Sequence, residues 1–322
     1  MPTPLRVVFM GTPDFAIPSL KSLAARPDIA TIVAVYTQPD RPAGRGQKLT
    51  KPPIKIVAEE LGLPIFQPEN INDPDEKRKL ADQMADVVVV VAYAQFLGNA
   101  ILNTPRLGCV NVHSSLLPKY RGAAPIQFAI WKGEKESGVT TMRLVKKMDA
   151  GPILLQRSIP ITGEMTAREL HDELAKLGGG LIVETLAQLR DSKIQETAQD
   201  ESKVTYAALI KKEDGLIKWE NKGTEIINQI RAFDPWPGTY GRSTRGTLKI
   251  LKAKFHPSIQ GMPSDLKAGD VFTGAGSLMV RCADGWIEPI TLQPEGKKPM
   301  QAQEYLNGIR NSGLKFDGGS SS

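Results

Sequence analysis

The chain has few of the residues that bind metals or form disulfides, and it has no long hydrophobic run. Its 322 residues include two cysteines and three histidines, without the close spacing of a metal-binding motif, so we expect no metal. Cys109 and Cys282 each lie in an apolar run, as buried, reduced thiols of a cytosolic protein do. No apolar run approaches the length that spans a bilayer. We therefore expect a cytoplasmic protein that contacts no membrane.

Acidic residues are missing from two basic stretches. The first covers residues 41–55 and contains Arg41, Arg45, Lys48, Lys51 and Lys55. The second covers residues 235–264 and contains Arg242, Arg245, Lys249, Lys252 and Lys254. Stretches of this kind predict contact with a polyanion such as a nucleic acid. Solvated loop and strand faces are the alternative, because the net charge of +6 is modest.

The first half of the chain alternates apolar and amphipathic segments. The apolar segments predict strands at residues 5–10, 29–36, 86–92, 107–113, 138–145 and 153–161. The amphipathic segments predict helices at residues 15–25, 54–61 and 75–84. Together they predict a doubly wound, mostly parallel α/β sheet of Rossmann-like type. The first strand–helix junction, Gly11-Thr-Pro-Asp-Phe15, lacks the three-glycine fingerprint, so we expect no dinucleotide cofactor.

The second half predicts a smaller, β-rich domain. Residues 166–189 predict one or two helices, broken at Gly178-Gly-Gly180. A helix at 224–233 precedes five short strands at 239–243, 248–255, 271–273, 278–282 and 287–292, and a last helix covers 301–311. Short strands divided by Gly and Pro favour a small OB-like β-barrel. We expect domains at 1–190 and 211–316, a polar linker at 191–210 and a disordered tail at 317–322.

The most informative segment is Asn111-Val-His-Ser-Ser-Leu-Leu-Pro-Lys-Tyr120, which begins in a predicted strand. Asn111 and His113 are two residues apart and should project from the same face. Asp149 follows another strand pattern, in a turn before Gly151. An amide, an imidazole and a carboxylate at strand ends suit acyl transfer. The alternatives are that His113 is a hydrogen-bonded core residue and that Asp149 only forms a turn.

Two further segments suggest ligand contacts. Leu116, Leu117 and Pro118 form an apolar, stiff stretch beside His113. Tyr93-Ala-Gln-Phe-Leu97 follows the most apolar strand and should reach the same sheet edge, where a flat aromatic ligand could lie. A simple entry into a helix is the alternative. The proline-rich residues 37–53 have the composition of a recognition loop, although an inert loop is possible.

Several of these motifs together resemble the folate-dependent formyltransferases over nearly the whole length. The resemblance rests on Gly11-Thr-Pro-Asp-Phe15, Asn111-Val-His113, Ser115-Leu-Leu-Pro118, Arg121-Gly-Ala-Ala-Pro-Ile-Gln127 and Asp149-Ala-Gly151. Gln38-Pro-Asp-Arg-Pro-Ala-Gly-Arg-Gly46, Phe233-Asp-Pro-Trp-Pro237 and Leu292-Gln-Pro-Glu-Gly-Lys-Lys298 narrow it to the branch that acts on tRNA. Ser114, where glycine is common, and Ala94-Gln-Phe depart from the family pattern and leave the details of the folate pocket open.

The resemblance implies transfer of the formyl group of 10-formyltetrahydrofolate to the α-amino group of methionyl-initiator tRNA. Asn111 and His113 would stabilise the oxyanion, His113 would move the proton, and Asp149 would orient His113 and favour its protonated form. The folate-binding residues implied are Ser115, Leu116, Leu117, Pro118, Tyr93, Phe96 and Leu97. Arg41, Arg45, Lys48, Arg242 and Lys249 would bind the tRNA acceptor arm.

Other classes of function remain open. A formyltransferase for a nucleotide-linked amino sugar or another small amine would keep the same three polar residues. A 10-formyltetrahydrofolate hydrolase would also keep them but would use no amine. A non-enzymatic tRNA-binding protein would need only the basic stretches. The resemblance favours a tRNA-acting enzyme. We expect it to be a monomer, and the residues themselves predict no metal and no dinucleotide.

Overall fold

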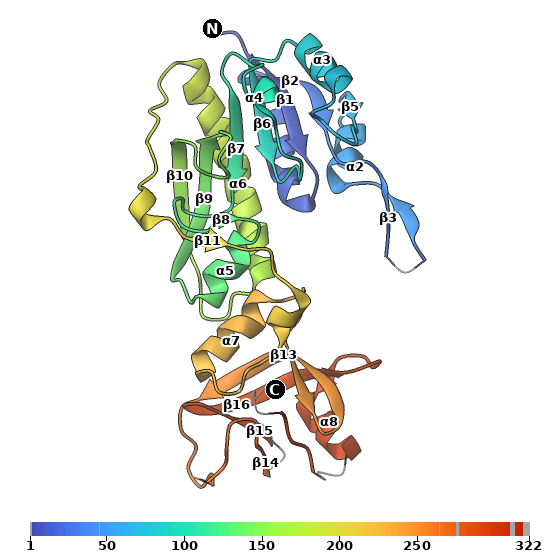
Figure 1. The fold of residues 1–322 in the computed structure, drawn as a ribbon, viewed down its shortest axis with the longest axis vertical. Helices are drawn as coiled ribbons and strands as arrows, with labels where there is room; N and C mark the ends of the chain where they lie inside the picture. The colour runs from blue at the N-terminus through green and yellow to red at the C-terminus, as the bar shows by residue number, and fades with distance from the viewer. Residues whose placement is uncertain (1, 45, 264, 275–276, 310–312, 318–322) are drawn as a thin grey trace. The chain divides into compact units, whose positions relative to one another are not determined.

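The computed structural model describes residues 2–44, 46–263, 265–274, 277–309 and 313–317. Chain contacts divide it into two compact units (Figure 1). The first unit comprises the chain up to Pro125, Glu136–Pro160 and His171–Ala207. The second comprises Ile126–Lys135, Ile161–Leu170 and the chain from Ala208 onward. Among the described helices, none is long and apolar enough to cross a membrane.

The first unit is built on a seven-stranded sheet of order β10-β9-β7-β6-β1-β2-β5. Its strands are β1 (Leu5–Gly11), β2 (Ala30–Tyr36), β5 (Ile65–Phe66), β6 (Val87–Val91), β7 (Cys109–His113), β9 (Glu136–Arg143) and β10 (Ile153–Pro160). The five strands from β7 to β5 run parallel, whereas β9 is antiparallel to both of its neighbours. The predicted doubly wound, mostly parallel sheet is confirmed.

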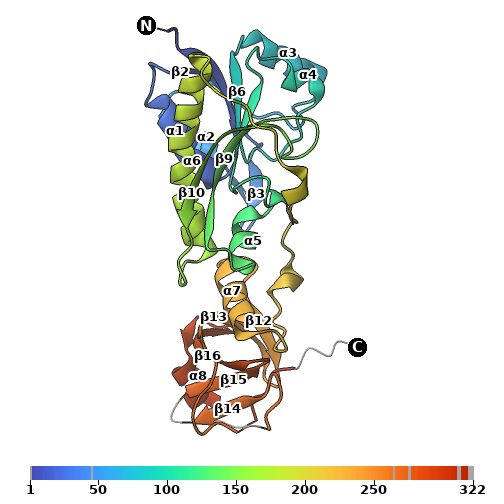
Figure 2. The same ribbon diagram turned by 90° about the vertical axis from the view of Figure 1, so that its left-hand side faces the viewer.

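Helices cover both faces of this sheet (Figure 2). They are α1 (Ile17–Ala24), α2 (Pro53–Glu60), α3 (Pro74–Asp82), α4 (Asn99–Leu102) and α6 (Ala167–Arg190), and a 3₁₀ turn, η1 (Asp14–Ala16), precedes α1. A further helix, α5 (Pro125–Trp131), belongs from Ile126 onward to the second unit. Leu80 of α3 and Ile101 of α4 share a core with Cys109 of β7. Because side chains alternate along a strand, Asn111 and His113 project from the same face as Cys109. Both cysteine thiols are buried, as predicted.

The predicted break at Gly178-Gly-Gly180 is wrong, because α6 continues through all three glycines. A Cβ on Gly178 would lie 3.0 Å from Val112 Cγ1, and one on Gly179 would lie 2.9 Å from the carbonyl oxygen of Pro18. The glycines therefore allow α6 to approach both the sheet and α1. Burial against these elements outweighs the low helix propensity of glycine.

The second unit contains a six-stranded antiparallel sheet. Its elements are η3 (Lys212–Gly215), α7 (Gly223–Ala232), β12 (Tyr240–Ser243), β13 (Gly246–His256), β14 (Val271–Gly274), β15 (Ser277–Cys282), β16 (Gly285–Pro294), β17 (Met300–Gln301) and α8 (Ala302–Ile309). In the described part of the chain, the strand order β12-β13-β16-β15-β14, with β17 on β16, makes a half-barrel. This agrees with the predicted OB-like domain. Trp219 and Phe316 pack together in its core.

Three segments expected to be irregular or disordered are partly ordered. Residues 37–53 include a hairpin of β3 (Arg41–Ala43) and β4 (Lys48–Thr50). The linker contains η2 (Glu201–Lys203) and β11 (Tyr206–Ala207), and β11 pairs in parallel with β8 (Arg121–Gly122). In the expected tail, the Asp317 backbone N–H donates to the carbonyl of Arg242 at 3.0 Å, and residues 318–322 lie outside the described part.

Candidate active site

Asn111 and His113 lie together at the end of β7, as predicted. Asn111 pairs with Met142 and His113 pairs with Thr140 of β9, which runs antiparallel to β7. Asn111 is half-buried, and His113 is 6% exposed. On the other edge of β7, Asn111 pairs with Val90 of the buried strand β6. The amide and the imidazole are therefore carried by a strand that is fixed on both sides.

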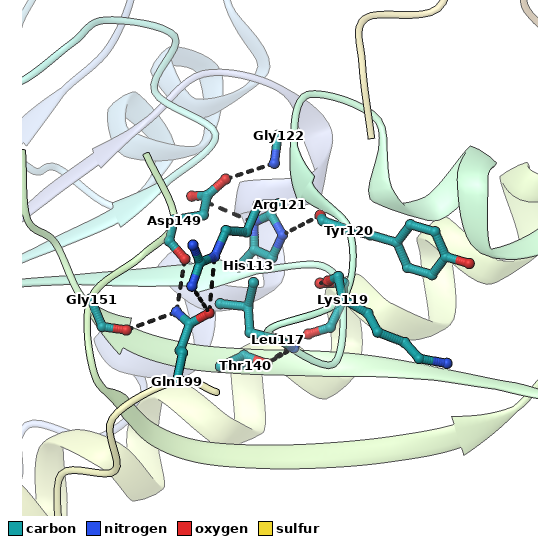
Figure 3. A network of polar contacts seen from close by, with 11 residues as sticks. His113, Leu117, Lys119, Tyr120, Arg121, Gly122, Thr140, Asp149, Gly151 and Gln199 are labelled. Atoms are coloured by element: carbon teal, nitrogen blue, oxygen red, sulfur yellow. Dashed lines mark hydrogen bonds and ion pairs between the residues drawn. The ribbon is translucent and has the colours of Figure 1, made fainter. Parts of the chain in front are cut away.

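His113 lies between a carbonyl and a carboxylate (Figure 3). Its Nε2 is 3.0 Å from the carbonyl oxygen of Tyr120. Because a carbonyl only accepts, Nε2 carries the hydrogen in this contact. Nδ1 is 3.9 Å from Asp149 Oδ1, which is within ion-pair range but too long for a hydrogen bond. The carboxylate therefore faces the ring nitrogen that does not contact the carbonyl.

The Asp149 carboxylate is oriented by the backbone. Its Oδ2 accepts a hydrogen bond of 2.8 Å from the Gly122 N–H. Asp149 itself has a φ of 50°, in the left-handed region, and its side chain reaches Gly122 of β8. The sequence pattern correctly predicts that His113 and Asp149 lie together, but it does not reveal the contribution of Gly122.

A buried arginine of β8 contacts the linker, and the linker in turn contacts the Asp149 loop. The Arg121 side chain is fully buried, and its Nη2 donates to Gln199 Oε1 at 2.8 Å and to Glu201 Oε1 at 2.7 Å. Gln199 Nε2 donates in turn to the carbonyl oxygens of Asp149 (2.7 Å) and Gly151 (2.8 Å). Hydrogen bonds from Arg121 and Lys147 lower the pKa of the Glu201 carboxyl to about 2.

The apolar segment after His113 is held by polar side chains of β9 and β10. Thr140 Oγ1 donates to the Ser115 carbonyl at 2.6 Å and accepts from the Leu117 N–H at 3.1 Å. Gln156 Nε2 donates to the Leu117 carbonyl at 2.8 Å. The Ser115 hydroxyl donates to the Lys119 carbonyl, so this side chain closes the loop. Leu116 and Pro118 remain partly exposed beside the site.

The three residues that we expect to contact a flat aromatic ligand differ in their exposure to solvent. Tyr93 is 1% exposed and belongs to the core, and its carbonyl accepts hydrogen bonds from Thr12 and Gln38. Leu97 is buried in the same core. Phe96 is 63% exposed and accessible to a ligand. The assignment of all three to a folate pocket remains a prediction.

The predicted tRNA-binding residues lie on two hairpins. Arg41 and Lys48 are exposed on β3 and β4, and Arg41 Nη2 contacts Glu69 Oε2 at 2.5 Å. Arg45 lies outside the described residues. Arg242 and Lys249 are exposed on β12 and β13, where Lys249 pairs with Tyr240, two residues before Arg242. Arg242 and Lys249 therefore share one face of this hairpin.

Sequence reasoning missed four side chains that support the site, namely Gln199, Glu201, Thr140 and Gln156. Thr140 and Gln156 look like ordinary strand residues. Gln199 and Glu201 lie in a polar, aperiodic stretch that is typical of a linker. The one signal in the sequence is Arg121, a charged residue beside apolar ones within a motif of the family.

The fold and the site together define a formyl transferase. The sequence matches the formyl transferase family over residues 5–186 and the formyl transferase C-terminal domain over residues 209–310. A solved N-formyltransferase from Helicobacter canadensis, in complex with folinic acid and dTDP-3-aminofucose, has a TM-score of 0.63 at 20% identity, covering 88% of this chain and 98% of that one. HypX from Aquifex aeolicus, in complex with tetrahydrofolic acid, has a TM-score of 0.60 at 14% identity, covering 96% of this chain. This chain spans about half (48%) of HypX.

Relatives of similar length show to which kind of formyl transferase the chain belongs. A methionyl-tRNA formyltransferase from Geobacter metallireducens is 43% identical over 306 residues, covering 95% of this chain and 96% of the relative. One from Citrifermentans bemidjiense is 42% identical over 308 residues, covering 96% and 95%. The chain belongs to the methionyl-tRNA formyltransferase family.

Proposed function

We propose that this enzyme transfers the formyl group of 10-formyltetrahydrofolate to the α-amino group of methionyl-initiator tRNA, giving formylmethionyl-tRNA. The observation that carries the proposal is the approach of Asp149 to His113 beside Asn111, in a chain 42–43% identical to relatives of that name. We further propose that it acts as a cytoplasmic monomer.

Asn111 provides the oxyanion contact in this proposal. The amine nitrogen attacks the formyl carbon, the N–C bond forms, and the formyl oxygen gains negative charge. The Asn111 amide can donate a hydrogen bond to that oxygen from the end of β7. A donor of this kind contributes about 3 kcal/mol to transition-state stabilisation. The amine itself needs little activation, since an α-amine with a pKa near 8 is partly neutral at pH 7.

His113 moves the proton. The attacking amine must lose a proton, and N10 of the folate must gain one as the C–N10 bond breaks. Nε2 already donates to the Tyr120 carbonyl, which leaves Nδ1 as the nitrogen that takes up and releases the proton. The imidazolium formed in between is stabilised by the Asp149 carboxylate. The proposed folate site lies along Ser115–Pro118, with the pterin near Tyr93, Phe96 and Leu97.

The two basic hairpins supply the proposed contacts to the tRNA acceptor arm. Arg41 and Lys48 come from one hairpin, and Arg242 and Lys249 from the other. Arg45, which lies outside the described residues, completes the proposed set. Contacts of such cations to phosphates give affinity and salt dependence rather than base recognition.

The test is formyl transfer from 10-formyltetrahydrofolate to three acceptors: charged initiator methionyl-tRNA, elongator methionyl-tRNA and dTDP-3-aminofucose. We expect transfer to the initiator tRNA at the highest kcat/KM. Transfer to the amino sugar alone would favour the sugar formyltransferase alternative. Release of formate without any formylated acceptor would indicate a hydrolase.

A further inference from the structure

Gln199 holds the main chain of the Asp149 turn at two points (Figure 3). Its side-chain amide donates to the carbonyl oxygens of Asp149 and Gly151, on either side of Ala150. Its side-chain oxygen accepts from Arg121 Nε at 3.1 Å and Nη2 at 2.8 Å. Gln199 therefore uses both ends of its amide, and one end acts only on the loop that carries Asp149.

The turn held by Gln199 has little freedom on its other side. A Cβ on Gly151 would overlap the carbonyl oxygen of Arg143, so the turn is pressed against the end of β9. Asp149 has a φ of 50°, in the left-handed region, which costs free energy for a residue with a side chain. The two hydrogen bonds from the Gln199 side chain restrain the carbonyl groups of Asp149 and Gly151.

The same linker also holds the group that orients the Asp149 carboxylate. Gly122 donates its N–H to Asp149 Oδ2, and Gly122 lies in β8, which pairs with β11 of the linker. The Arg121 N–H donates to the Thr205 carbonyl at 2.9 Å. Residues 199–207 thus fix both the main chain of Asp149, through Gln199, and its carboxylate, through β8.

We propose that Gln199 is a positioning residue for formyl transfer, which keeps the Asp149 carboxylate within reach of His113. The proposal rests on the proposed function only for its kinetic consequence, because the geometric consequence can be observed without turnover. Gln199 touches neither His113 nor the reacting atoms. Its replacement should therefore slow the chemical step and leave the binding of both substrates intact.

Two variants separate the contacts of Gln199. Gln199→Met keeps the size of the side chain and removes every hydrogen bond. Gln199→Glu keeps an acceptor for Arg121 but turns a carboxylate oxygen toward the carbonyls of Asp149 and Gly151. We expect both variants to lower kcat by about tenfold to a hundredfold, the effect of a misplacement of about 1 Å. The KM values for folate and tRNA should change by less than about twofold.

The histidines provide a readout that does not depend on activity. The protein has three, so ¹⁵N NMR of the labelled rings can be assigned with His171→Gln and His256→Gln. In both Gln199 variants we expect the His113 ring signals to shift and those of His171 and His256 to stay. Gln188→Met is the matched control and should behave as the parent protein, because the Gln188 side chain donates to Glu184 on α6 and not to the Asp149 turn.

Parent-like kcat in Gln199→Glu, or unshifted His113 signals in both variants, would overturn the proposal. So would a rise in KM with unchanged kcat, because that result would assign Gln199 to substrate binding. If Gln199→Met does not fold, Gln199→Glu decides alone, since it retains the contact with Arg121. A parent protein that formylates no methionyl-tRNA would contradict the proposed function and leave the NMR result for Gln199 standing.

Discussion

At the scale of single residues, the site depends on which groups already hold the side chains that we propose to be catalytic. The His113 imidazole is fixed at Nε2 by a backbone carbonyl, so only Nδ1 faces the charge of Asp149. The carboxylate is fixed in turn by a backbone N–H, which needs an acceptor rather than a charge. The charge of Asp149 and its orientation can therefore be separated by substitution.

Asp149→Asn makes this separation, because an asparagine can still accept from the Gly122 N–H but cannot stabilise an imidazolium. We expect kcat to fall by about a hundredfold, the usual size of a general acid–base contribution. The dissociation constant for the folate should not change. Steady-state formyl transfer and folate titration measure the two quantities. A parent-like rate would show that the charge of Asp149 has no part in the proton transfer.

Asn111→Ala tests the oxyanion contact separately. Removing one donor of this type costs about a hundredfold or more in kcat, with little change in KM, because the interaction forms only in the transition state. Asn103→Ala, an exposed asparagine after α4, is the control. Comparison of kcat and KM in the two variants is sufficient. An increase in KM alone for Asn111→Ala would assign this residue to ground-state binding.

The Glu201 carboxyl makes the stability of the first unit sensitive to acid. Its pKa of about 2 in the folded protein lies below the ordinary value of 4.5, because Arg121 and Lys147 bind its charged form. The stabilisation is present above about pH 4.5 and is lost as the pH falls toward 2. We expect Glu201→Gln to lower Tm at pH 7 and to reduce the decrease of Tm between pH 4.5 and 2. Equal pH slopes for parent and variant would contradict this assignment.

At the scale of elements, α6 shows how packing determines the effect of replacing a glycine by a larger residue. Gly179 faces the carbonyl of Pro18 on α1, whereas a Cβ on Gly180 would meet nothing within 4 Å. Two adjacent residues of one helix therefore give opposite predictions for the same substitution. Contacts with another element decide the outcome at Gly179, and intrinsic helix propensity decides it at Gly180.

We expect Gly180→Ala to stabilise the protein by up to about 1 kcal/mol, the difference in helix propensity between the two residues. Gly179→Ala should destabilise it, because the new methyl group forces α6 away from α1. Urea unfolding of both variants measures these changes in the free energy of unfolding. Stabilisation by both substitutions would mean that α6 and α1 are not in close contact.

The elements that the sequence predicts well are those with local patterns. The apolar strands β1, β6 and β7 and the amphipathic helix α2 are recognisable from their own residues. The linker is different, because β11 forms only by pairing with β8, more than 80 residues earlier. Gln199 belongs to the site for the same reason. Its partners lie on a turn some 50 residues away, and no local pattern encodes that contact.

At the scale of the whole molecule, the two units carry separate basic hairpins, and a tRNA is large enough to contact several cations at once. Each phosphate contact releases counterions from the nucleic acid, so binding weakens as salt is added. The hairpin in the second unit lies on β12 and β13, whereas the proposed catalytic residues lie in the first unit. Removal of its charges should therefore affect tRNA binding without altering the chemical step.

The double variant Arg242→Ala/Lys249→Ala tests this separation, and Arg26→Ala/Lys79→Ala is a control that removes the same charge. In the control, both cations are already paired with acidic neighbours, Asp28 and Glu76. We expect the hairpin variant to raise the KM for tRNA and to reduce the slope of log KM against log salt by about 0.9 for each phosphate that the hairpin no longer neutralises. The KM for the folate and the kcat at saturating tRNA should stay at the parent values. An identical salt slope in both variants would mean that net charge, rather than this hairpin, governs tRNA binding, and it would remove Arg242 and Lys249 from the proposed interface.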